Sequence, residues 1–434
     1  MTTTYKTAGF AVLLFLVMLA GVELLVRGPL FPTAGDLASP YVSAIRFIHG
    51  ENPYPSDNFM TLLHSAGAPE SLSVNESGQH PIYPPTTLLV LAPLAELPWF
   101  WAAHCYVWAC TFGYLGLVWL LSRLVADTWG SWRRLGFIAF ALAISPIHTA
   151  IHHGNPTIMV FLLCGYALYC ARLRDSTISG IFLALGFCVK PTTALAAVLI
   201  VLLYGRIKSV LAFLGASALI VGCTAIVMSH IVPLWRSDYQ SNLDFLFGPK
   251  GAANFATHNT GHFDLVNLQM PLYSVFQNVR AANLLAWAIS AALAIVWLLL
   301  FLRGRTCKPD TYWIGVGSMS LLALLPVYQR NYNAGVILFV VLWAFDNLHE
   351  PLARAVLLLS GIFLIPGEAL LRRTGFADRF SGSVLWNLFA MSQLTWAVVA
   401  VLVLCFLYKW KRNTLGAAAQ WTQSSLSPSG LRPG

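Results

Sequence analysis

Residues 284–302 read LLAWAISAALAIVWLLLFL and contain no charged side chain. Residues 11–20 read AVLLFLVMLA and have the same character. Both runs are continuous rather than alternating, which is typical of membrane-spanning helices and not of transmembrane β-strands. Within a bilayer every backbone polar group needs a partner in the protein, and a continuous apolar run meets that need as a helix. These segments predict an all-α membrane protein.

The composition of the whole chain agrees with this prediction. Its 434 residues are 57% hydrophobic and 10% charged, with a mean hydropathy of +0.68. A soluble domain carries about a quarter charged residues, so this chain lacks the polar surface of a water-soluble globule. The net charge of +9 comes from basic residues placed singly or in short clusters between apolar runs. That pattern favours orientation in a membrane, and no nucleic-acid partner is expected.

The apolar runs divide the chain into about twelve predicted transmembrane helices. Residues 1–412 are expected to form a single integral membrane domain, and the Ala-, Gln-, Ser- and Pro-rich segment 413–434 a disordered cytoplasmic tail. The predicted spans lie near residues 8–26, 101–124, 135–150, 156–171, 177–189, 191–204, 209–231, 281–302, 311–327, 333–347, 352–368 and 384–408.

Two further helices are predicted in the long segment between the first two spans. Residues 37–49 place Tyr41, Ile45 and Ile48 at helical spacing, as in an amphipathic helix. Residues 86–97 are apolar but too short to cross a bilayer. Both are expected to be interfacial or re-entrant helices.

The basic residues predict the orientation of the chain. With Lys6 and both termini in the cytoplasm, most Lys and Arg residues fall in short cytoplasmic loops, as the positive-inside rule requires. The two longest loops, about 28–99 and 232–280, then lie outside and form the active-site face. Arg372, Arg373 and Arg379 are the exception, because they also fall outside. The expected location is the plasma (inner) membrane.

In this topology, most of the unusual polar residues lie at the outer face of the membrane. Ionisable groups at membrane depth are costly and are therefore functional candidates. The candidates come from five separate loops: Asp36; His152, His153 and Asn155; Lys190; His258, Asn259 and His262; and Tyr328, Gln329 and Arg330.

Each candidate also has a structural interpretation. Asp36, between Gly35 and Leu37, is either the cap of the following helix or a general base toward a hydroxyl group. Lys190, flanked by apolar residues, needs an anionic partner, which is a carboxylate or a ligand phosphate. Arg330 is either a snorkelling side chain in an aromatic belt or a phosphate ligand.

Metal and nucleotide chemistry have no support in the sequence. His152 and His153 are adjacent, so on a helix their side chains diverge by about 100° and make a poor metal pair. The sequence contains no GxGxxG, P-loop, nucleophile elbow or HExxH motif, and no Asp-x-Asp nucleotide-sugar motif. No metal and no cofactor are expected.

Several motifs resemble those of glycosyltransferase family 87, over about residues 30–345. That family typically shows an Asp, then a helix ending in Gly-x-x-Pro-Tyr, then Tyr-Pro-Pro before an apolar helix ending in Pro-Leu. Lys190-Pro191 is similar to its Lys-Pro element, and His153-Gly154-Asn155 to its Gly-Gln-x-Asn element, although the Gln is absent here. The other matching segments are Gly35-Asp36-Leu37, residues 48–54, Pro81–Thr86, Leu91–Leu94, Leu97-Pro98 and Leu325–Tyr332.

The resemblance implies a GT-C fold and a membrane hexosyltransferase that uses a polyprenyl-phosphate sugar, with mannose as the default. It implies Asp36 as the catalytic base, which takes a proton from a hydroxyl of a glycolipid or polysaccharide acceptor. Gln329 and Arg330 stand where relatives often carry a His for the donor phosphate. The expected donor site comprises Lys190, Arg330, Gln329, Tyr328, His153 and Asn155, and the expected acceptor or loop site comprises His258, Asn259, His262 and Tyr83.

Two other functions remain open at this point. A transporter or flippase of lipid-linked glycans would have polar residues threaded through mid-span positions, whereas here they cluster at one face. A ligase of the O-antigen type would also have large outer loops with Arg and His. An assay with a polyprenyl-phosphate monosaccharide separates the two from a family 87 enzyme.

Overall fold

The computed structural model describes residues 3–125, 131–231, 234–256, 264–302, 309–365, 374–375, 379–380 and 383–425. Within these ranges the regular structure is helical, and the sole pairing of extended backbone is an antiparallel bridge between Leu265 and Arg330. The prediction of an all-α fold is confirmed for this part of the chain.

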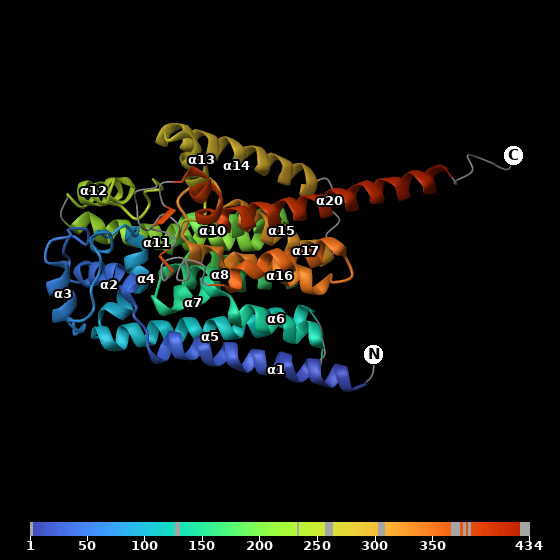
Figure 1. The fold of residues 1–434 in the computed structure, drawn as a ribbon. Coiled ribbons are helices and arrows are strands. Elements are labelled where there is room, and N and C mark those ends of the chain that lie inside the picture. The colour runs from blue at the N-terminus through green and yellow to red at the C-terminus, as the bar shows by residue number, and fades with distance from the viewer. Residues whose placement is uncertain are drawn as a thin grey trace.

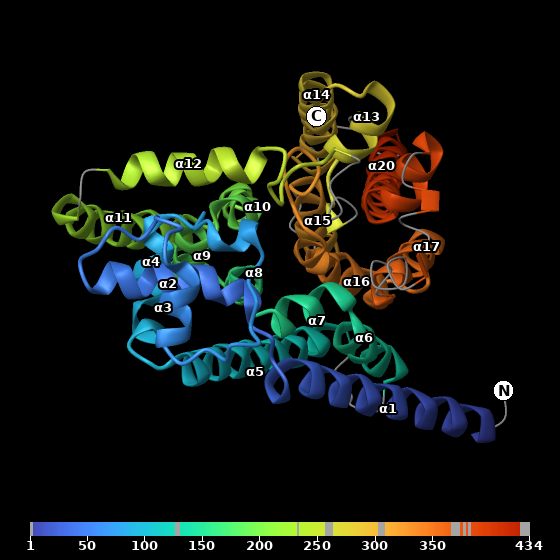
Figure 2. The same ribbon diagram turned by 60° about the vertical axis from the view of Figure 1, so that its left-hand side comes forward.

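In Figure 1 most of the longer helices run across the picture, and α2 (Gly35–Ile48), α3 (Phe59–Ser65) and α12 (Trp235–Phe247) lie at the end away from the start of α1 (Thr3–Leu25). In Figure 2 α14 (Val279–Leu302) is seen nearly end-on while α1 is seen lengthwise, so these two helices cross at an angle. The longer or more central helices are α1 (Thr3–Leu25), α5 (Trp99–Val125), α6 (Trp132–Ala143), α7 (Ser145–His152), α8 (Pro156–Leu173), α9 (Thr177–Val189), α10 (Pro191–Leu203), α11 (Ile207–His230), α14 (Val279–Leu302), α15 (Pro309–Leu322), α16 (Ile337–Asp346), α17 (Pro351–Ser360) and α20 (Gln393–Ser425). The helices of the two long loops are α2 (Gly35–Ile48), α3 (Phe59–Ser65), α4 (Pro85–Ala95), α12 (Trp235–Phe247) and α13 (Gln269–Phe276). Shorter 3-10 or π segments are η1 (Val26–Leu30), η2 (Glu76–Gln79), η4 (Asn331–Val336), η5 (Gly361–Leu364) and η6 (Trp386–Met391).

Length and composition identify fewer membrane spans than the sequence predicts. Among the described residues, six helical stretches are long and apolar enough to cross a membrane, and a seventh is reached if α6 and α7 form one bent span. Other apolar helices, such as α9 and α10 with 13 residues each, are shorter than the usual span. A helix rises about 1.5 Å per residue, so 13 residues cover about 20 Å of a core that is about 30 Å thick. The protein is thus a multi-helix membrane protein, and twelve crossings stay a prediction.

The predicted span at 135–150 is broken in two. The chain bends by 44° between α6 and α7, with Ile144 in an extended conformation at the break. Pro146 explains the break, because its ring removes the N–H that would bond to the carbonyl of Leu142 four residues earlier. The side chain of His148 bonds to that carbonyl instead.

The two predicted helices of the first long loop are present as α2 and α4, which pack against each other. Arg46 of α2 donates to the backbone carbonyls of Pro55 and Asp57 and so fixes the chain that follows the helix. The second long loop joins this assembly through Asn242 of α12, whose Nδ2 donates to the carbonyl oxygens of Tyr54 (2.8 Å) and Pro81 (2.9 Å). The two long loops are therefore bonded to each other.

The burial of the helices separates a centre from a periphery. The most apolar stretch of α8 is 61% buried, whereas those containing α1 and α11 are each only 11% buried. Large apolar side chains such as Leu219 (68% exposed) and Leu284 (72% exposed) face outward from α11 and α14. Such apolar surfaces are unfavourable in water and fit the acyl chains of a bilayer.

The last helix extends beyond the final predicted span. α20 continues to Ser425 and includes the start of the segment whose composition predicts disorder. Nδ2 of Asn413 donates to the carbonyl of Leu300 at 2.9 Å, which holds this part of α20 against α14. The three alanines at 417–419 are strong helix formers and account for the continuation. Residues 426–434 lie outside the described residues.

Candidate functional site

Asp36 lies in the first turn of α2, and backbone hydrogen bonds fix the loop that carries it. The N–H groups of Thr33 and Ala34 both donate to the carbonyl of His152 at 3.1 Å. The N–H of Asp36 donates to the carbonyl of His153 at 2.9 Å. Two segments far apart in the sequence, 33–36 and 152–153, are thus bonded along their backbones.

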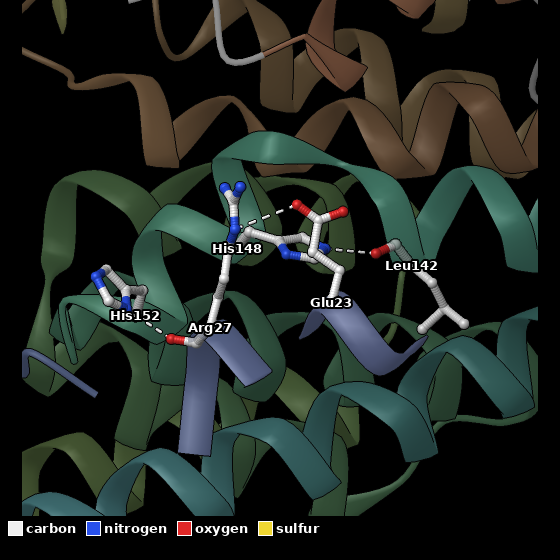
Figure 3. A network of polar contacts seen from close by, with 5 residues as sticks. All are labelled: Glu23, Arg27, Leu142, His148 and His152. Carbon is white, nitrogen blue, oxygen red and sulfur yellow. Dashed lines mark hydrogen bonds and ion pairs between the residues drawn. The ribbon is translucent and has the colours of Figure 1, made fainter. Parts of the chain in front are cut away.

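The segment around His152 is held in turn by η1, which continues α1, and by α6. Nδ1 of His152 bonds to the carbonyl of Arg27, and Nε2 of His148 bonds to the carbonyl of Leu142 (Figure 3). Both carbonyls lie where a helix ends or breaks, so each histidine satisfies an acceptor that lacks a helical partner. Arg27 also forms an ion pair with Glu23 at 3.2 Å on the surface of α1. The two histidines therefore have structural roles that attach α7 to its neighbours.

Gly154 allows the two segments to approach closely. Its φ is +62°, in the left-handed region that favours glycine. A Cβ atom at this position would lie 3.3 Å from the Cα of Ala34 and 3.3 Å from the Cβ of Leu37. A side chain here would push the start of α2 away, so Gly154 is required by both its backbone and its surroundings.

Asn155 connects the catalytic candidate to the bundle. It is only 3% exposed, and its Nδ2 donates to Oδ2 of Asp36 at 2.8 Å. Its Oδ1 accepts from the N–H of Thr157 at 2.9 Å and so caps α8. Asp36 itself makes no capping bond to α2. The capping interpretation of Asp36 is therefore wrong, and its carboxylate is instead oriented by a neutral amide.

Lys190 lies at the junction of α9 and α10, close to Asp36. Its Nζ donates to Oγ1 of Thr157 at 2.8 Å and to Oδ1 of Asn333 at 3.4 Å, and it lies 5.7 Å from the centre of the Tyr332 ring. Within the described part of the chain, no carboxylate forms an ion pair with Lys190. The pKa of Lys190 is lowered to about 8, chiefly by burial and also by the charge of Arg330, while Asp36 acts in the opposite direction. This ammonium group is available to an anion.

Arg330, the second predicted cation, has a protein partner. Its Nη2 forms an ion pair with Oδ2 of Asp264 at 2.9 Å, and the side chain of Asp264 is only 4% exposed. The backbone bridge between Leu265 and Arg330 holds the two partners side by side. Its Cζ lies 5.5 Å from the centre of the Tyr332 ring, so this ring contacts both cations. The charge of Arg330 is therefore balanced within the protein, unlike that of Lys190.

Three tyrosines complete the polar cluster: Tyr83, Tyr328 and Tyr332. Burial raises the pKa of Tyr83, and the nearby charges of Asp36 and Tyr328 raise it further, against the effect of Arg330. Burial likewise raises the pKa of Tyr332. All three phenols remain protonated at neutral pH and can donate hydrogen bonds. Tyr332 was visible in the sequence as part of the last motif, but only its contacts with Lys190 and Arg330 identify it as a site residue.

His153 contributes a neutral group rather than a cation. Burial is the main cause that lowers its pKa, the nearby Asp36 partly offsets this, and His152 lowers the pKa further. Its Nδ1 lies 3.1 Å from Oγ1 of Thr33. A neutral imidazole can form a hydrogen bond with a phosphate or sugar but does not add charge.

The remaining predicted residues are not all brought to this cluster. Gln329 is 1% exposed, and its backbone carbonyl accepts from Val266 at 2.8 Å. Side chains of neighbouring residues in an extended segment point to opposite faces, so Gln329 and Arg330 cannot both face Asp36. The predicted acceptor residues His258, Asn259 and His262 lie outside the described residues. Asp264, the partner of Arg330, stands out in the sequence as an unusual polar residue of the second outer loop, but nothing in the sequence pairs it with Arg330.

An apolar pocket of about 300 Å³ lies beside α4, the helix that follows Tyr83. It is lined by residues of α4, α11 and α12: Pro85, Thr86, Val221, Thr224, Ala225, Met228, Ser229, Trp235 and Arg236. Thr86 donates to the carbonyl of Cys188, and Thr87 donates to that of Val189 at 2.9 Å. These bonds link the pocket wall directly to the turn that carries Lys190. No group of three or more His, Cys, Asp or Glu side chains that could hold a metal ion occurs among the residues described.

Comparison with known proteins decides the family. The family model for glycosyltransferase family 87 matches residues 82–327, more than half of the chain. The chain belongs to glycosyltransferase family 87. No curated protein and no solved structure matches it. Within this family 87 member, the matched segment includes Tyr83, His153, Asn155, Lys190 and Asp264, whereas Asp36 precedes it and Arg330 follows it directly. The site is therefore assembled from the matched segment and both of its flanks.

Proposed function

We propose that this family 87 glycosyltransferase transfers a hexose, mannose by default, from a polyprenyl-phosphate donor to a hydroxyl group of a glycolipid or polysaccharide. The observation that carries the proposal is the arrangement of Asp36 and Lys190. A carboxylate held by a neutral amide lies close to an ammonium group that has no carboxylate partner in the described chain. A general base and a cation for a phosphate are the two groups that such a transfer requires.

The chemical step follows from these two groups. Asp36 accepts the proton of the acceptor hydroxyl as the acceptor oxygen forms a bond to the anomeric carbon. The bond from that carbon to the phosphate oxygen breaks, and the polyprenyl phosphate leaves with the electron pair. Lys190 stabilises the charge on the leaving phosphate, and the remaining N–H groups of Arg330 and the ring of His153 add hydrogen bonds. A single displacement of this kind inverts the anomeric configuration and requires no metal ion.

The apolar pocket supports a lipid-linked donor over a soluble one. It is lined in part by α11, a helix whose apolar residues are mostly exposed, as expected for a surface in contact with lipid. Its wall is bonded to the turn that carries Lys190, so a phosphate at Lys190 has an apolar surface beside it for an isoprenoid chain. A soluble nucleotide sugar would have no use for that surface.

The proposal includes an orientation in the plasma membrane. The structure has helices at all twelve predicted spans, of which α6 and α7 together make one. We propose that all twelve cross the bilayer, with both termini in the cytoplasm and Asp36 at the extracytoplasmic face. Cysteine introduced at Ser71 should react with an impermeant thiol reagent in intact cells, and cysteine at Ser131 should not. The opposite labelling pattern would reverse the orientation.

The activity is tested with purified protein in nanodiscs. A polyprenyl-phosphate monosaccharide carrying a labelled sugar is incubated with a lipid and glycan extract as acceptor, and the product is analysed for transfer and anomeric configuration. The proposal expects transfer with inversion. Transfer of a preassembled glycan from a polyprenyl diphosphate, with none from the monophosphate, would indicate a ligase instead. Movement of a lipid-linked glycan across the membrane without transfer would indicate a flippase.

A further inference from the structure

A second cluster of cations lies at the opposite end of the helices from Asp36. α8 begins beside Asp36 at its cap Asn155 and ends at Leu173, and its 18 residues span about 27 Å at 1.5 Å per residue. α10 runs the same way from Lys190, and α15 begins at this far end before leading back toward Tyr328. Arg172 of α8 and Arg206, which precedes α11, therefore lie about one bilayer thickness from the candidate active site.

Both arginines lie near one buried aromatic group, Tyr312. The Cζ of Arg172 lies 6.0 Å from the centre of the Tyr312 ring. Tyr204, two residues before Arg206, packs against the same ring with its centre 4.9 Å away, which brings Arg206 into this neighbourhood. The hydroxyl of Tyr312 donates to the carbonyl of Leu168 at 2.9 Å and remains a neutral group. The Tyr312 ring contacts the guanidinium group of Arg172, but it does not balance the positive charge of the two arginines.

Asp175, an acid whose charge acts on Arg206, is engaged by hydrogen bonds to the start of α11. Oδ2 of Asp175 accepts from the N–H of Lys208 at 2.9 Å. Its Oδ1 accepts from the N–H of Ser209 at 2.9 Å and from the hydroxyl of Ser209 at 3.0 Å. These bonds satisfy the free N–H groups at the start of α11. Among the described residues, no carboxylate forms an ion pair with Arg172 or Arg206.

The guanidinium groups also retain unused donors. Nε of Arg172 and Nε of Arg206 are both buried, and neither has a hydrogen-bond partner in the part of the chain that the structure describes. A buried donor left unpaired is destabilising, and a snorkelling arginine avoids that cost by placing its head in water. Two such donors, one near the end of α8 and one just before α11, indicate a ligand that accepts hydrogen bonds and carries negative charge.

We propose that Arg172 and Arg206 bind the phosphate of an anionic phospholipid headgroup at the membrane face opposite Asp36. Each guanidinium group can pair with two phosphate oxygens; one of them balances the single negative charge of a phosphodiester, and the second adds further hydrogen bonds. The surrounding surface suits a lipid, because Leu173 (59% exposed), Ile207 (56%) and Leu211 (63%) lie next to the arginines in sequence and face outward. A lipid bound here bridges the end of α8 and the start of α11. This site does not depend on the proposed transfer reaction.

The binding is tested by native mass spectrometry of the purified protein with phosphatidylglycerol or phosphatidylcholine added. The test variant combines Arg172→Gln and Arg206→Gln. The matched control combines Arg174→Gln and Lys208→Gln, which removes the same charge from exposed neighbours at the same face. Wild type and control should retain phosphatidylglycerol in preference to phosphatidylcholine, and the test variant should lose at least tenfold in that retention. A variant with Arg172→Lys and Arg206→Lys should recover part of it, because the charge remains and the paired geometry does not.

Three results would overturn the proposal. The first is unchanged retention by the test variant. The second is an equal loss in the control, which would show general attraction of lipids to a basic face. The third comes from thermal unfolding in detergent: stabilisation by inorganic phosphate but not by phosphatidylglycerol would assign the arginines to a soluble anion. If the test variant proves unstable, the partial recovery with lysine in a folded protein decides the outcome.

Discussion

Asp36 and Asp264 are two carboxylates near Arg330, and the protein binds them in different ways. Asp36 accepts a hydrogen bond from the neutral amide of Asn155, whereas Asp264 forms an ion pair with Arg330. The two cations differ in the same way. Arg330 is paired with a carboxylate, whereas Lys190 is held by the neutral groups of Thr157 and Asn333. In the half of the site with Asp36 and Lys190, the carboxylate and the cation do not form an ion pair. In the half with Asp264 and Arg330, they do.

The difference indicates that the two halves of the site have different roles. A carboxylate and an ammonium group that are held by neutral partners remain available to a substrate. A carboxylate and a guanidinium group that are paired have already offset each other's charge. We therefore assign the proton transfer and the main stabilisation of the leaving phosphate to the half with Asp36 and Lys190. The half with Asp264 and Arg330 holds the segment 264–268 against 325–330, and the remaining N–H groups of Arg330 add only hydrogen bonds to the phosphate. Backbone bonds from Val266 to Gln329 and from Leu268 to Leu325 also hold these two segments together.

The largest effect is expected for Asp36→Asn. The amide keeps the size of the side chain but is barely basic, so transfer should fall by about 10²–10⁴-fold, the usual contribution of a general base. Donor binding and folding should stay near those of the wild type. The measurement is the rate of transfer from saturating donor, with donor affinity measured in parallel. Asp36→Glu retains a base about one methylene out of place and should give intermediate activity. A rate in Asp36→Asn near that of the wild type would end the assignment of Asp36 as a base.

The next effect concerns Lys190. Lys190→Ala should weaken the interaction with the donor phosphate by about 1.5–3 kcal/mol, which is about tenfold to a hundredfold. Donor affinity in nanodiscs measures this directly, and Lys208→Ala, an exposed lysine at the far end of the helices, is the matched control. Unchanged donor affinity in Lys190→Ala would place the phosphate elsewhere.

A smaller effect is expected for Asn155→Ser. Serine still caps α8, so the stability should stay close to that of the wild type. Its shorter side chain cannot replace the 2.8 Å bond to Asp36, and the base becomes less well oriented. The turnover rate should fall by about tenfold, the value of one hydrogen bond to a charged group, with little change in donor affinity. A loss of donor affinity at constant turnover would instead make Asn155 a donor ligand.

The smallest effect is a dependence on pH. Lys190 has a lowered pKa of about 8, so it loses its proton as the pH rises through that value. Its attraction for a phosphate should therefore be present below pH 8 and decline above it. Donor affinity measured from pH 6.5 to 9.5 should fall several-fold in the wild type and stay level in Lys190→Ala. Equal slopes in the two proteins would assign the pH dependence to another group.

The sequence predicts much of the fold because its signals are local. The apolar runs and the spacing of Tyr41, Ile45 and Ile48 are sufficient to predict α2 to within two residues at its start. Prolines within several predicted spans, Pro146 among them, predict broken helices, but the residues around Pro146 remain apolar, so the sequence does not place the break before α7. Length alone does not distinguish a short crossing helix from a re-entrant one, so the twelve spans stay a prediction.

The sequence predicts which residues belong to the site but not which of them bond to one another. Asp36, Asn155 and Lys190 stand out as polar residues between apolar segments. The bond between Asn155 and Asp36 joins residues 119 positions apart, and the pair of Arg330 with Asp264 spans 66 positions. Such contacts depend on the packing of several helices, which no local pattern encodes. For the same reason Arg330 was expected to be a free cation, and its partner came only from the structure.

The most direct test of the division between the two halves compares two double variants in the same transfer assay. One combines Asp264→Asn with Arg330→Gln, and the other combines Asp36→Asn with Lys190→Gln. Removing both members of an ion pair leaves no unpaired charge, so the first variant should stay within about tenfold of the wild type and exceed either of its single variants. The second should lose at least about 10²-fold. Loss of transfer in the first variant with survival in the second would contradict the account.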